Sequence, residues 1–233
     1  MKTLLRFFFK LLYHQFAFTY DLVAGTVSLG RWKDWVMSVL PFIEGTHILE
    51  IGFGPGHLQR ALLSRGLVAV GIDESAQMAR LARHNLTKRI ASIPSVSENH
   101  NVPQTHQSDY AQISLMRGLA QHLPFCDHSF DTIVATFPAE YIFELTTLVE
   151  THRVLTENGK LIILPGASIL GRGIRDRFLA WLFRITGETP LDLSQILHEK
   201  SKGSFAKAGF HVQVQELEIR ASVVFIMIAT KVS

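Results

Sequence analysis

The chain has 233 residues, of which 47% are hydrophobic and 18% are charged, and its formal net charge is +3. This composition excludes a disordered or fibrous protein, and the length fits one large α/β domain better than two small ones. The small net charge, without a long basic run, argues against nucleic acid as a partner. The single cysteine, Cys126, cannot form an internal disulfide. We therefore expect a reducing, cytoplasmic setting and no metal site.

The N-terminal segment, residues 1–18, combines basic residues with a stretch rich in Phe and Leu. Lys10, His14 and Gln15 interrupt the apolar stretch, and no small-residue cleavage site follows. A signal peptide and a membrane-spanning helix are both disfavoured by this pattern. Two interpretations stay open. The aromatic residues pack onto the domain, which we favour, or an amphipathic helix makes a peripheral contact with the inner face of the membrane.

From about His47 onward, strand-length apolar runs alternate with segments of helical period, as expected for parallel βαβ units. The expected strands cover 46–51, 67–72, 113–117, 130–136 and 160–164, and the expected helices cover 57–65, 75–88 and 142–155. Two final strand runs, 210–219 and 222–230, are joined by so short a link that they must form an antiparallel hairpin. The sequence thus predicts five parallel strands and a C-terminal hairpin.

Two segments interrupt this alternation. Residues 91–112 are rich in Ser, Asn, Gln and Pro, and we expect a long loop there. Residues 165–202 contain a stretch typical of an amphipathic helix with flanking arginines. Because the strand pattern resumes after each segment, we interpret both as excursions from one domain that covers residues 1–233.

A glycine-rich turn, residues 52–56 (GFGPG), follows the first expected strand and leads directly into a helix. Such a turn brings backbone close to a ligand at the carboxyl end of a sheet. The third glycine of the nicotinamide fingerprint would fall on His57 and is missing. Asp73 ends the next strand, where a carboxylate can accept both ribose hydroxyls of an adenosine. Asp73 alone could cap the following helix, but together with the turn it predicts adenosine binding.

Four blocks of the chain resemble the class I S-adenosylmethionine-dependent methyltransferases, in particular the small ubiquinone-biosynthesis-like group (methyltransferase domain 11 type). The blocks are ILEIGFGPGHL (48–58), VGIDESAQM (70–78), GLAQHLPFCDHSFDTIVA (118–135) and ETHRVLTENGKLIIL (150–164). The resemblance implies a Rossmann-like seven-stranded α/β sheet with helices on both faces and S-adenosylmethionine as cofactor. It also implies an N-terminal helical cap over 1–44, in which Tyr20-Asp21 matches a Tyr-Asp pair of such enzymes, and a helical lid insertion over 165–202.

The resemblance also assigns roles to residues around the glycine-rich turn. The three glycines would let the loop pass the methionine moiety, Glu50 would organise the loop, and Asp73 would hold the ribose. The full expected cofactor-binding set is Tyr20, Glu50, Gly52, Phe53, Gly54, Gly56, Asp73, Glu74, Met78, Leu119, Ala120, Gln121 and Thr136.

Recognition of the adenine is expected to depart from that of many relatives. Ala120 and Gln121 match positions that flank the adenine. Leu119 stands where many relatives carry an acidic residue that binds the adenine amino group. We therefore expect backbone contacts and packing by Leu119 or Met78 to hold the ring in this chain.

The segment 136–141 (TFPAEY) follows the fourth strand and lacks the Asn/Asp-Pro-Pro-aromatic motif of enzymes that methylate bases. We expect Glu140, and with it Tyr141, to serve as the catalytic candidates that contact an acceptor. His122 and His152 are further candidates for a base, although His152 fits a structural or surface role better. Three aromatic residues could wall the sulfonium, with core packing as the alternative: Tyr20, Phe137 and Tyr141.

The leading functional hypothesis is S-adenosylmethionine-dependent methyl transfer to a small or lipophilic acceptor by direct in-line displacement. One alternative is a nicotinamide-dependent oxidoreductase on a Rossmann-like fold, and another is a non-catalytic S-adenosylmethionine-binding module. Residues 4–12 and 181–183, each with basic neighbours, could seat the protein on anionic lipid. The acceptor atom, the use of a general base, the oligomeric state and the role of the 91–112 loop stay open.

Overall fold

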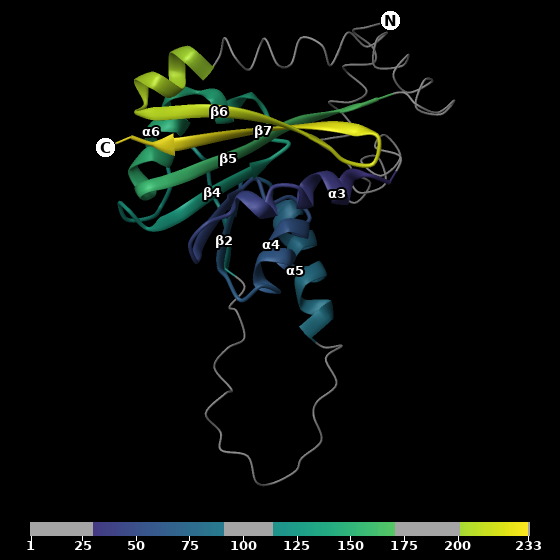
Figure 1. The fold of residues 1–233 in the computed structure, drawn as a ribbon. Coiled ribbons are helices and arrows are strands. Elements are labelled where there is room, and N and C mark those ends of the chain that lie inside the picture. The colour runs from purple at the N-terminus through teal and green to yellow at the C-terminus, as the bar shows by residue number, and fades with distance from the viewer. Residues whose placement is uncertain (1–29, 91–113, 171–200, 233) are drawn as a thin grey trace, which may run out of the picture.

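The computed structural model describes residues 30–90, 114–170 and 201–232. Its strands form one sheet in the order β3-β2-β1-β4-β5-β7-β6 (Figure 1). The strands are β1 (His47–Ile51), β2 (Val68–Asp73), β3 (Ser114–Arg117), β4 (Phe130–Thr136), β5 (Leu155–Ile169), β6 (Phe210–Glu218) and β7 (Ser222–Lys231). The helices and helical turns are α3 (Trp32–Met37), η2 (Leu40–Phe42), α4 (His57–Leu63), α5 (Ala76–Ile90), η3 (Glu140–Phe143), α6 (Leu145–Val154) and η5 (Ser201–Phe205).

The topology confirms the expected architecture of five parallel strands and a C-terminal hairpin. Strands β1 to β5 pair in parallel, and β7 pairs antiparallel with both β5 and β6. The chain first builds outward from β1 to β3 and then returns to the other side of β1 to form β4. The order therefore reverses at β1, and a ligand crevice is expected at the carboxyl ends of the strands beside it.

The central strands are buried on both faces. Leu49 and Ile133 belong to a core that includes α6, whereas their chain neighbours Ile48 and Val134 belong to a core that includes α3 and α4. Successive side chains of a strand point to opposite faces, so this alternation places helices on both sides of the sheet, as expected. In Figure 1, α3, α4 and α5 lie together on one side.

The C-terminal hairpin closes in a two-residue turn that links β6 to β7. Ile219 and Ser222 exchange two backbone hydrogen bonds of 2.8 and 3.0 Å across it. The turn residues Arg220 and Ala221 both have positive φ, 46° and 56°. The Arg220 guanidinium also forms an ion pair of 2.8 Å with Asp34 of α3. The hairpin is therefore tied to the helix that lies beside the ligand crevice.

Two expected elements, one helix and one strand, had wrong boundaries. The helix expected over 142–155 is interrupted at Glu144, whose ψ of 139° is extended, so the chain forms η3 and then α6. The strand expected over 160–164 was too short at both ends. It begins at Leu155, which pairs with Phe130 of β4, and it continues to Ile169 because residues 166–169 pair antiparallel with β7. β5 thus enters the segment expected to be the lid. The order of the other expected elements is confirmed, with ends that shift by about two residues or less.

Several expectations fall outside the described residues. These are Tyr20 and most of the N-terminal cap, the loop over 91–112, and most of the lid with its residues 181–183. The division into domain, cap and lid stays a prediction. Among the helices that the structure describes, none has the length and apolar character needed to cross a membrane.

Candidate functional site

The glycine-rich turn is held against the end of β2 by a short set of hydrogen bonds. The backbone N–H of Gly52 donates to the Ile72 carbonyl over 2.7 Å. The Gly54 N–H donates to Asp73 Oδ2 over 3.0 Å, and the Ser75 N–H donates to Asp73 Oδ1 over 2.8 Å. Asp73 therefore joins the turn after β1 to the start of α5, at the point where the strand order reverses.

Two glycines of this turn are required for different reasons. A Cβ on Gly52 would lie 3.0 Å from the Tyr141 hydroxyl, a tight contact, and the φ of 72° at this position would strain any other residue. A Cβ on Gly54, whose φ is 49°, would meet nothing within 4 Å. Gly54 thus exposes backbone to open space, as a loop that lies against a ligand must do.

Glu50 lies beneath the turn and carries the most perturbed carboxyl group of the site. It is 1% exposed, and burial raises its pKa to about 8. Hydrogen bonds from Gln59 oppose the shift, while the charge of Asp73 adds to it. Its Oε2 atom has no hydrogen-bond partner within the described ranges. A buried carboxylate oxygen without a donor is costly, so it favours a cationic or hydrogen-bond-donating ligand.

Burial also raises the pKa of Asp73, against the effect of its backbone hydrogen bonds from Ser75 and Gly54. Each of its oxygens accepts one backbone N–H, which leaves a lone pair on each for a further donor. Asp73 can therefore support the loop and accept hydrogen bonds from a ligand at the same time.

Aromatic residues close the side of the site formed by α3 and β4. Trp32, Glu50 and Thr136 line a cavity of about 30 Å³ beside the glycine-rich turn, together with Phe53. Phe137 is not among the residues that line this cavity. Its ring stacks on Trp32 with centroids 4.0 Å apart, in a backbone conformation with φ of 49°. Of the two interpretations of Phe137, packing against the core is the one that the geometry supports.

The segment expected to flank an adenine lies between β3 and β4. Leu119 is 48% exposed and Ala120 is buried. The Gln121 side-chain amide donates to Glu144 Oε2 over 3.1 Å. Met78 lies half-buried on α5, whose first turn is capped by the Ser75 hydroxyl at 3.3 Å from the Met78 N–H.

The backbone of Glu74 links the end of β2 to β3, because its carbonyl accepts two hydrogen bonds of 3.3 and 3.2 Å from the Arg117 guanidinium. The Glu74 side chain is exposed. Gly56 ends the turn where a Cβ would lie 3.1 Å from that of Ala82, so α5 packs closely on the turn. The described members of the expected cofactor-binding set thus surround the carboxyl ends of β1 and β2 and the loop after β3.

Of the catalytic candidates, Tyr141 and Glu140 lie at the glycine-rich turn, whereas His152 lies elsewhere. Tyr141 lies over Gly52, and burial raises its pKa to about 12, with added effects of Asp73 and Glu74. Glu140, at the start of η3, is exposed beside it. His152 does not lie near Tyr141 and Glu140.

His152 lies at the other end of the sheet, where its ring packs edge-on against Phe210 with centroids 5.3 Å apart. This placement supports its interpretation as a structural histidine. His122 is exposed in the turn after Leu119. Cys126 is exposed.

Two polar residues that hold the site, Gln59 and Arg153, were not predicted from the sequence. Gln59 is 1% exposed and donates both to Glu50 and, over 3.3 Å, to the Val70 carbonyl. Arg153 donates to Glu150, Asp127 and two carbonyls, and thereby fixes the loop that carries Leu119. Helical periodicity treats polar residues as exposed. For Gln59, the one available signal was that a buried Glu50 needs a hydrogen-bond donor nearby.

The described residues fit an S-adenosyl group. Open space lies above Gly54, a buried carboxylate oxygen of Glu50 lacks a donor, and Asp73 has lone pairs where the ribose is expected. The exposed Leu119 offers an apolar surface on the other side. These hydrogen-bond acceptors and this apolar surface are therefore suited to a ligand with an ammonium group, vicinal hydroxyls and a flat ring.

Comparison with known proteins agrees with this arrangement. Residues 49–163 match a family model described as a methyltransferase domain. The demethylmenaquinone methyltransferase of Symbiobacterium thermophilum is 29% identical over 179 residues, which cover 73% of this chain and 63% of that protein. A ubiquinone/menaquinone biosynthesis C-methyltransferase of Geotalea uraniireducens is 24% identical, over 62% of this chain and 57% of that protein. The chain thus spans less than two thirds of the length of these relatives.

Solved structures share the fold. Phosphoethanolamine N-methyltransferase 2 of Haemonchus contortus, in complex with S-adenosyl-L-methionine, superposes with a TM-score of 0.58 at 16% identity, over 96% of this chain and 60% of that chain. The magnesium protoporphyrin IX methyltransferase of Synechocystis PCC 6803, with bound S-adenosylhomocysteine, gives a TM-score of 0.51 at 16% identity, over 89% and 83% of the two chains.

The fold and the site together define a class I methyltransferase domain of Rossmann-like architecture with a reversed last strand. The methyltransferase domain over residues 49–163 is similar to the S-adenosylmethionine-dependent methyltransferases of the ubiquinone-biosynthesis-like group, as the sequence motifs predicted. The oxidoreductase alternative gains no support, since His57 occupies the place of the third fingerprint glycine and begins α4.

Proposed function

We propose that this protein binds S-adenosylmethionine at the glycine-rich turn and transfers its methyl group to a small, lipophilic, quinone-like acceptor. The observation that carries the proposal is the set of groups that Gly54, Asp73 and Glu50 present at the glycine-rich turn. It combines an open backbone surface, a carboxylate with free lone pairs and a buried oxygen without a donor. The quinone-like acceptor is supported by the names of the relatives from S. thermophilum and G. uraniireducens.

The chain's own groups would divide the work of binding. Asp73 accepts the ribose hydroxyls while its bond to Gly54 keeps the turn in place. Glu50 Oε2 accepts a hydrogen bond from the ammonium group of the methionine moiety, and ionisation of Glu50 becomes favourable when that cation is near. Leu119 packs on the adenine. It stands where many relatives carry an acidic residue that binds the adenine amino group. Phe53 and Thr136 line the cavity beside the glycine-rich turn.

When bound, S-adenosylmethionine supplies a sulfonium-activated methyl group that needs no further activation by the protein. The protein aligns the acceptor with that methyl group and excludes water. Tyr141 keeps its proton at neutral pH because its pKa is about 12, so it donates a hydrogen bond to the acceptor and does not act as a base. Glu140, exposed beside it, is the carboxylate available to accept a proton from an acceptor hydroxyl.

Binding of S-adenosylhomocysteine, measured by calorimetry, tests the cofactor part. Wild-type protein should bind with micromolar affinity. Asp73→Ala should lose more than about tenfold, or ~1.4 kcal/mol, because the ribose contact is removed. Glu216→Ala, which removes an exposed carboxylate from β6, is the matched control and should keep its affinity. Absence of binding in well-folded wild-type protein would refute the proposal.

Methyl transfer to a demethylmenaquinol with a short isoprenoid tail tests the acceptor part. Labelled S-adenosylmethionine should place its methyl group on the quinol ring, and Glu140→Gln should lower kcat more than it lowers S-adenosylhomocysteine affinity. Firm cofactor binding without transfer to any quinol, phenol or amine offered would instead support the non-catalytic binding module.

A further inference from the structure

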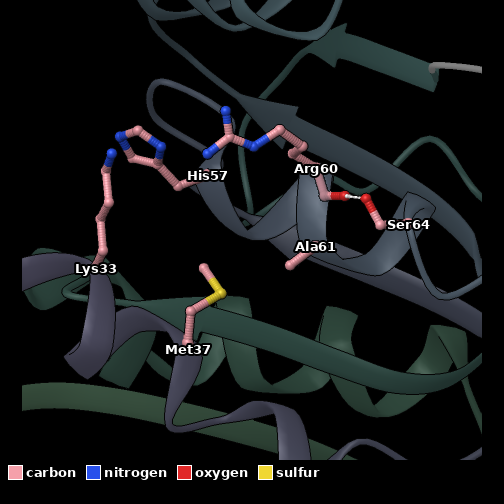
Figure 2. A pocket seen from close by; sticks show the side chains of 6 residues that line it. All are labelled: Lys33, Met37, His57, Arg60, Ala61 and Ser64. Atoms are coloured by element: carbon pink, nitrogen blue, oxygen red, sulfur yellow. Dashed lines mark hydrogen bonds between the residues drawn. The ribbon is translucent and has the colours of Figure 1, made fainter. Parts of the chain in front are cut away.

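A second pocket lies in the groove between α3 and α4, next to the site described above. Its volume is about 220 Å³, which is below the ~300–1,000 Å³ of a typical site for a drug-sized molecule. It is lined by Lys33, Met37, His57, Arg60, Ala61 and Ser64 (Figure 2). The set contains three basic side chains and no acidic one, so the pocket is suited to a small anion.

The two helices build this pocket from one stripe each. On α3 the lining residues are four positions apart, and on α4 and its C-cap they follow the i, i+3, i+4, i+7 spacing of one helix face. The opposite stripes, with Trp35 and Val36 on α3 and Leu58 and Leu62 on α4, are buried in the core. The pocket is therefore made by the pairing of α3 with α4 and does not depend on a single flexible side chain.

Two cations of the pocket, Lys33 and Arg60, are not neutralised by the described residues. Neither the Lys33 ammonium nor the Arg60 guanidinium forms an ion pair or hydrogen bond within residues 30–90, 114–170 and 201–232. The nearest acid along the chain, Asp34, is held by Arg220 at 2.8 Å. Figure 2 shows the Lys33 and Arg60 side chains on either side of the His57 ring. Clustered positive charge of this kind attracts an anion.

The floor of the pocket narrows the choice of anion. Met37 and Ala61 form an apolar base beneath the basic groups (Figure 2). The Ser64 hydroxyl donates to the Arg60 carbonyl over 2.8 Å and keeps its oxygen as an acceptor. A charged phosphate that carries a carbon substituent would meet both kinds of surface. Arg and Lys are the usual residues that bind phosphate.

We propose that the groove between α3 and α4 binds a phosphate ester, with Lys33 and Arg60 on the phosphate and Met37 and Ala61 beneath its carbon substituent. Either a phospholipid headgroup or a soluble phosphoester presents this chemistry. His57 lines both this pocket and the cavity at the glycine-rich turn, so the bound phosphate lies beside the cofactor site. If the acceptor is lipophilic, as proposed above, a headgroup in this groove would hold that site at the membrane surface.

The test compares the double variant Lys33→Gln/Arg60→Gln with Arg83→Gln/Lys207→Gln, which removes the same charge from exposed positions on α5 and near η5. One probe is vesicles of phosphatidylcholine with about one third phosphatidylglycerol, and the other is glycerol 3-phosphate at constant ionic strength. We expect wild-type protein to bind the vesicles and the double variant to lose about tenfold or more, while the control loses less than about twofold. Glycerol 3-phosphate should raise the Tm of wild type and control only.

Discrimination with both probes assigns the pocket to a lipid headgroup, and discrimination with glycerol 3-phosphate alone assigns it to a soluble phosphoester. Equal losses in the double variant and the control, with both probes, would overturn the proposal. The swapped variant Lys33→Arg/Arg60→Lys keeps the charge and should keep binding. Affinity for S-adenosylhomocysteine, measured in each variant, reports that the fold is intact. Its absence in all of them would reject the proposed function without bearing on the phosphate site.

Discussion

Glu50 is the residue at which function and stability should conflict most clearly. Its pKa rises from 4.5 to about 8 because it is buried, so the folded protein holds a proton that the unfolded chain has released above pH 4.5. The free energy of unfolding therefore falls as pH rises from about 4.5 to about 8. At about 1.4 kcal/mol per pKa unit, the ionised carboxylate costs on the order of 3–5 kcal/mol at pH 8. Glu50→Gln removes this cost and keeps nearly the same shape.

Urea unfolding at pH 5.5 and pH 8 measures the effect. We expect Glu50→Gln to be more stable than wild type at pH 8, by an amount about 2–3 kcal/mol larger than its difference from wild type at pH 5.5. Glu216→Gln, at an exposed position of β6, controls for the loss of a carboxylate. A stability difference that is equal at the two pH values would refute the reasoning, because it would mean that Glu50 ionises normally in the folded protein.

The same substitution should weaken the binding of S-adenosylhomocysteine. A ligand ammonium beside Glu50 Oε2 favours the ionised carboxylate, so binding near pH 7 should release close to one proton from wild-type protein and almost none from Glu50→Gln. Calorimetry in buffers of different ionisation enthalpy measures the number of protons released on binding. Equal proton release from both proteins would show that the ligand ammonium does not act on Glu50.

Ala221→Gly should raise the free energy of unfolding in urea by about 0.5–1 kcal/mol, because it relieves a positive φ. Gln215→Gly, in the adjoining strand β6, should lower it, and a stabilising effect there would contradict this reasoning. Arg153→Met should cost about 2–4 kcal/mol and weaken S-adenosylhomocysteine binding, since it breaks five hydrogen bonds under the adenine-side loop; unchanged affinity would separate that loop from the cofactor. Burial lowers the pKa of His152 below 6.5, so stability present above that pH should be lost as pH falls through it, and His152→Phe should flatten that profile in urea titrations.

The strands could be predicted from the sequence because buried parallel strands appear as continuous apolar runs that end at glycine or aspartate. Residues 130–136 were predicted without error, and β1 and β2 to within one residue at each end. Helix ends were harder. No glycine or proline marks the break at Glu144, where the chain turns extended and the carboxylate accepts a hydrogen bond from Gln121. That partner lies 23 residues away, beyond the reach of a local pattern.

The end of β5 was missed for a related reason. Pro165 and Gly166 are typical of a strand end. The antiparallel neighbour β7 nevertheless continues past them, with a register shift between Ile163 and Gly166 that accommodates the irregularity. Local preference set the prediction, and pairing with a strand some 60 residues further along set the structure.

The exceptions to local rules gather at one place in the fold. Glu50 is a buried carboxyl group with an oxygen that lacks a hydrogen-bond partner among the described residues, Phe137 holds a left-handed backbone, and Leu119 is a large apolar side chain left exposed. All three follow or end strands at the carboxyl edge of the sheet, around the point where its order reverses. Each departure costs stability in the protein alone, and a ligand with an ammonium group and a flat ring would offset two of them. The pattern of local costs therefore points to the same ligand site as the glycine-rich turn, by an independent physical route.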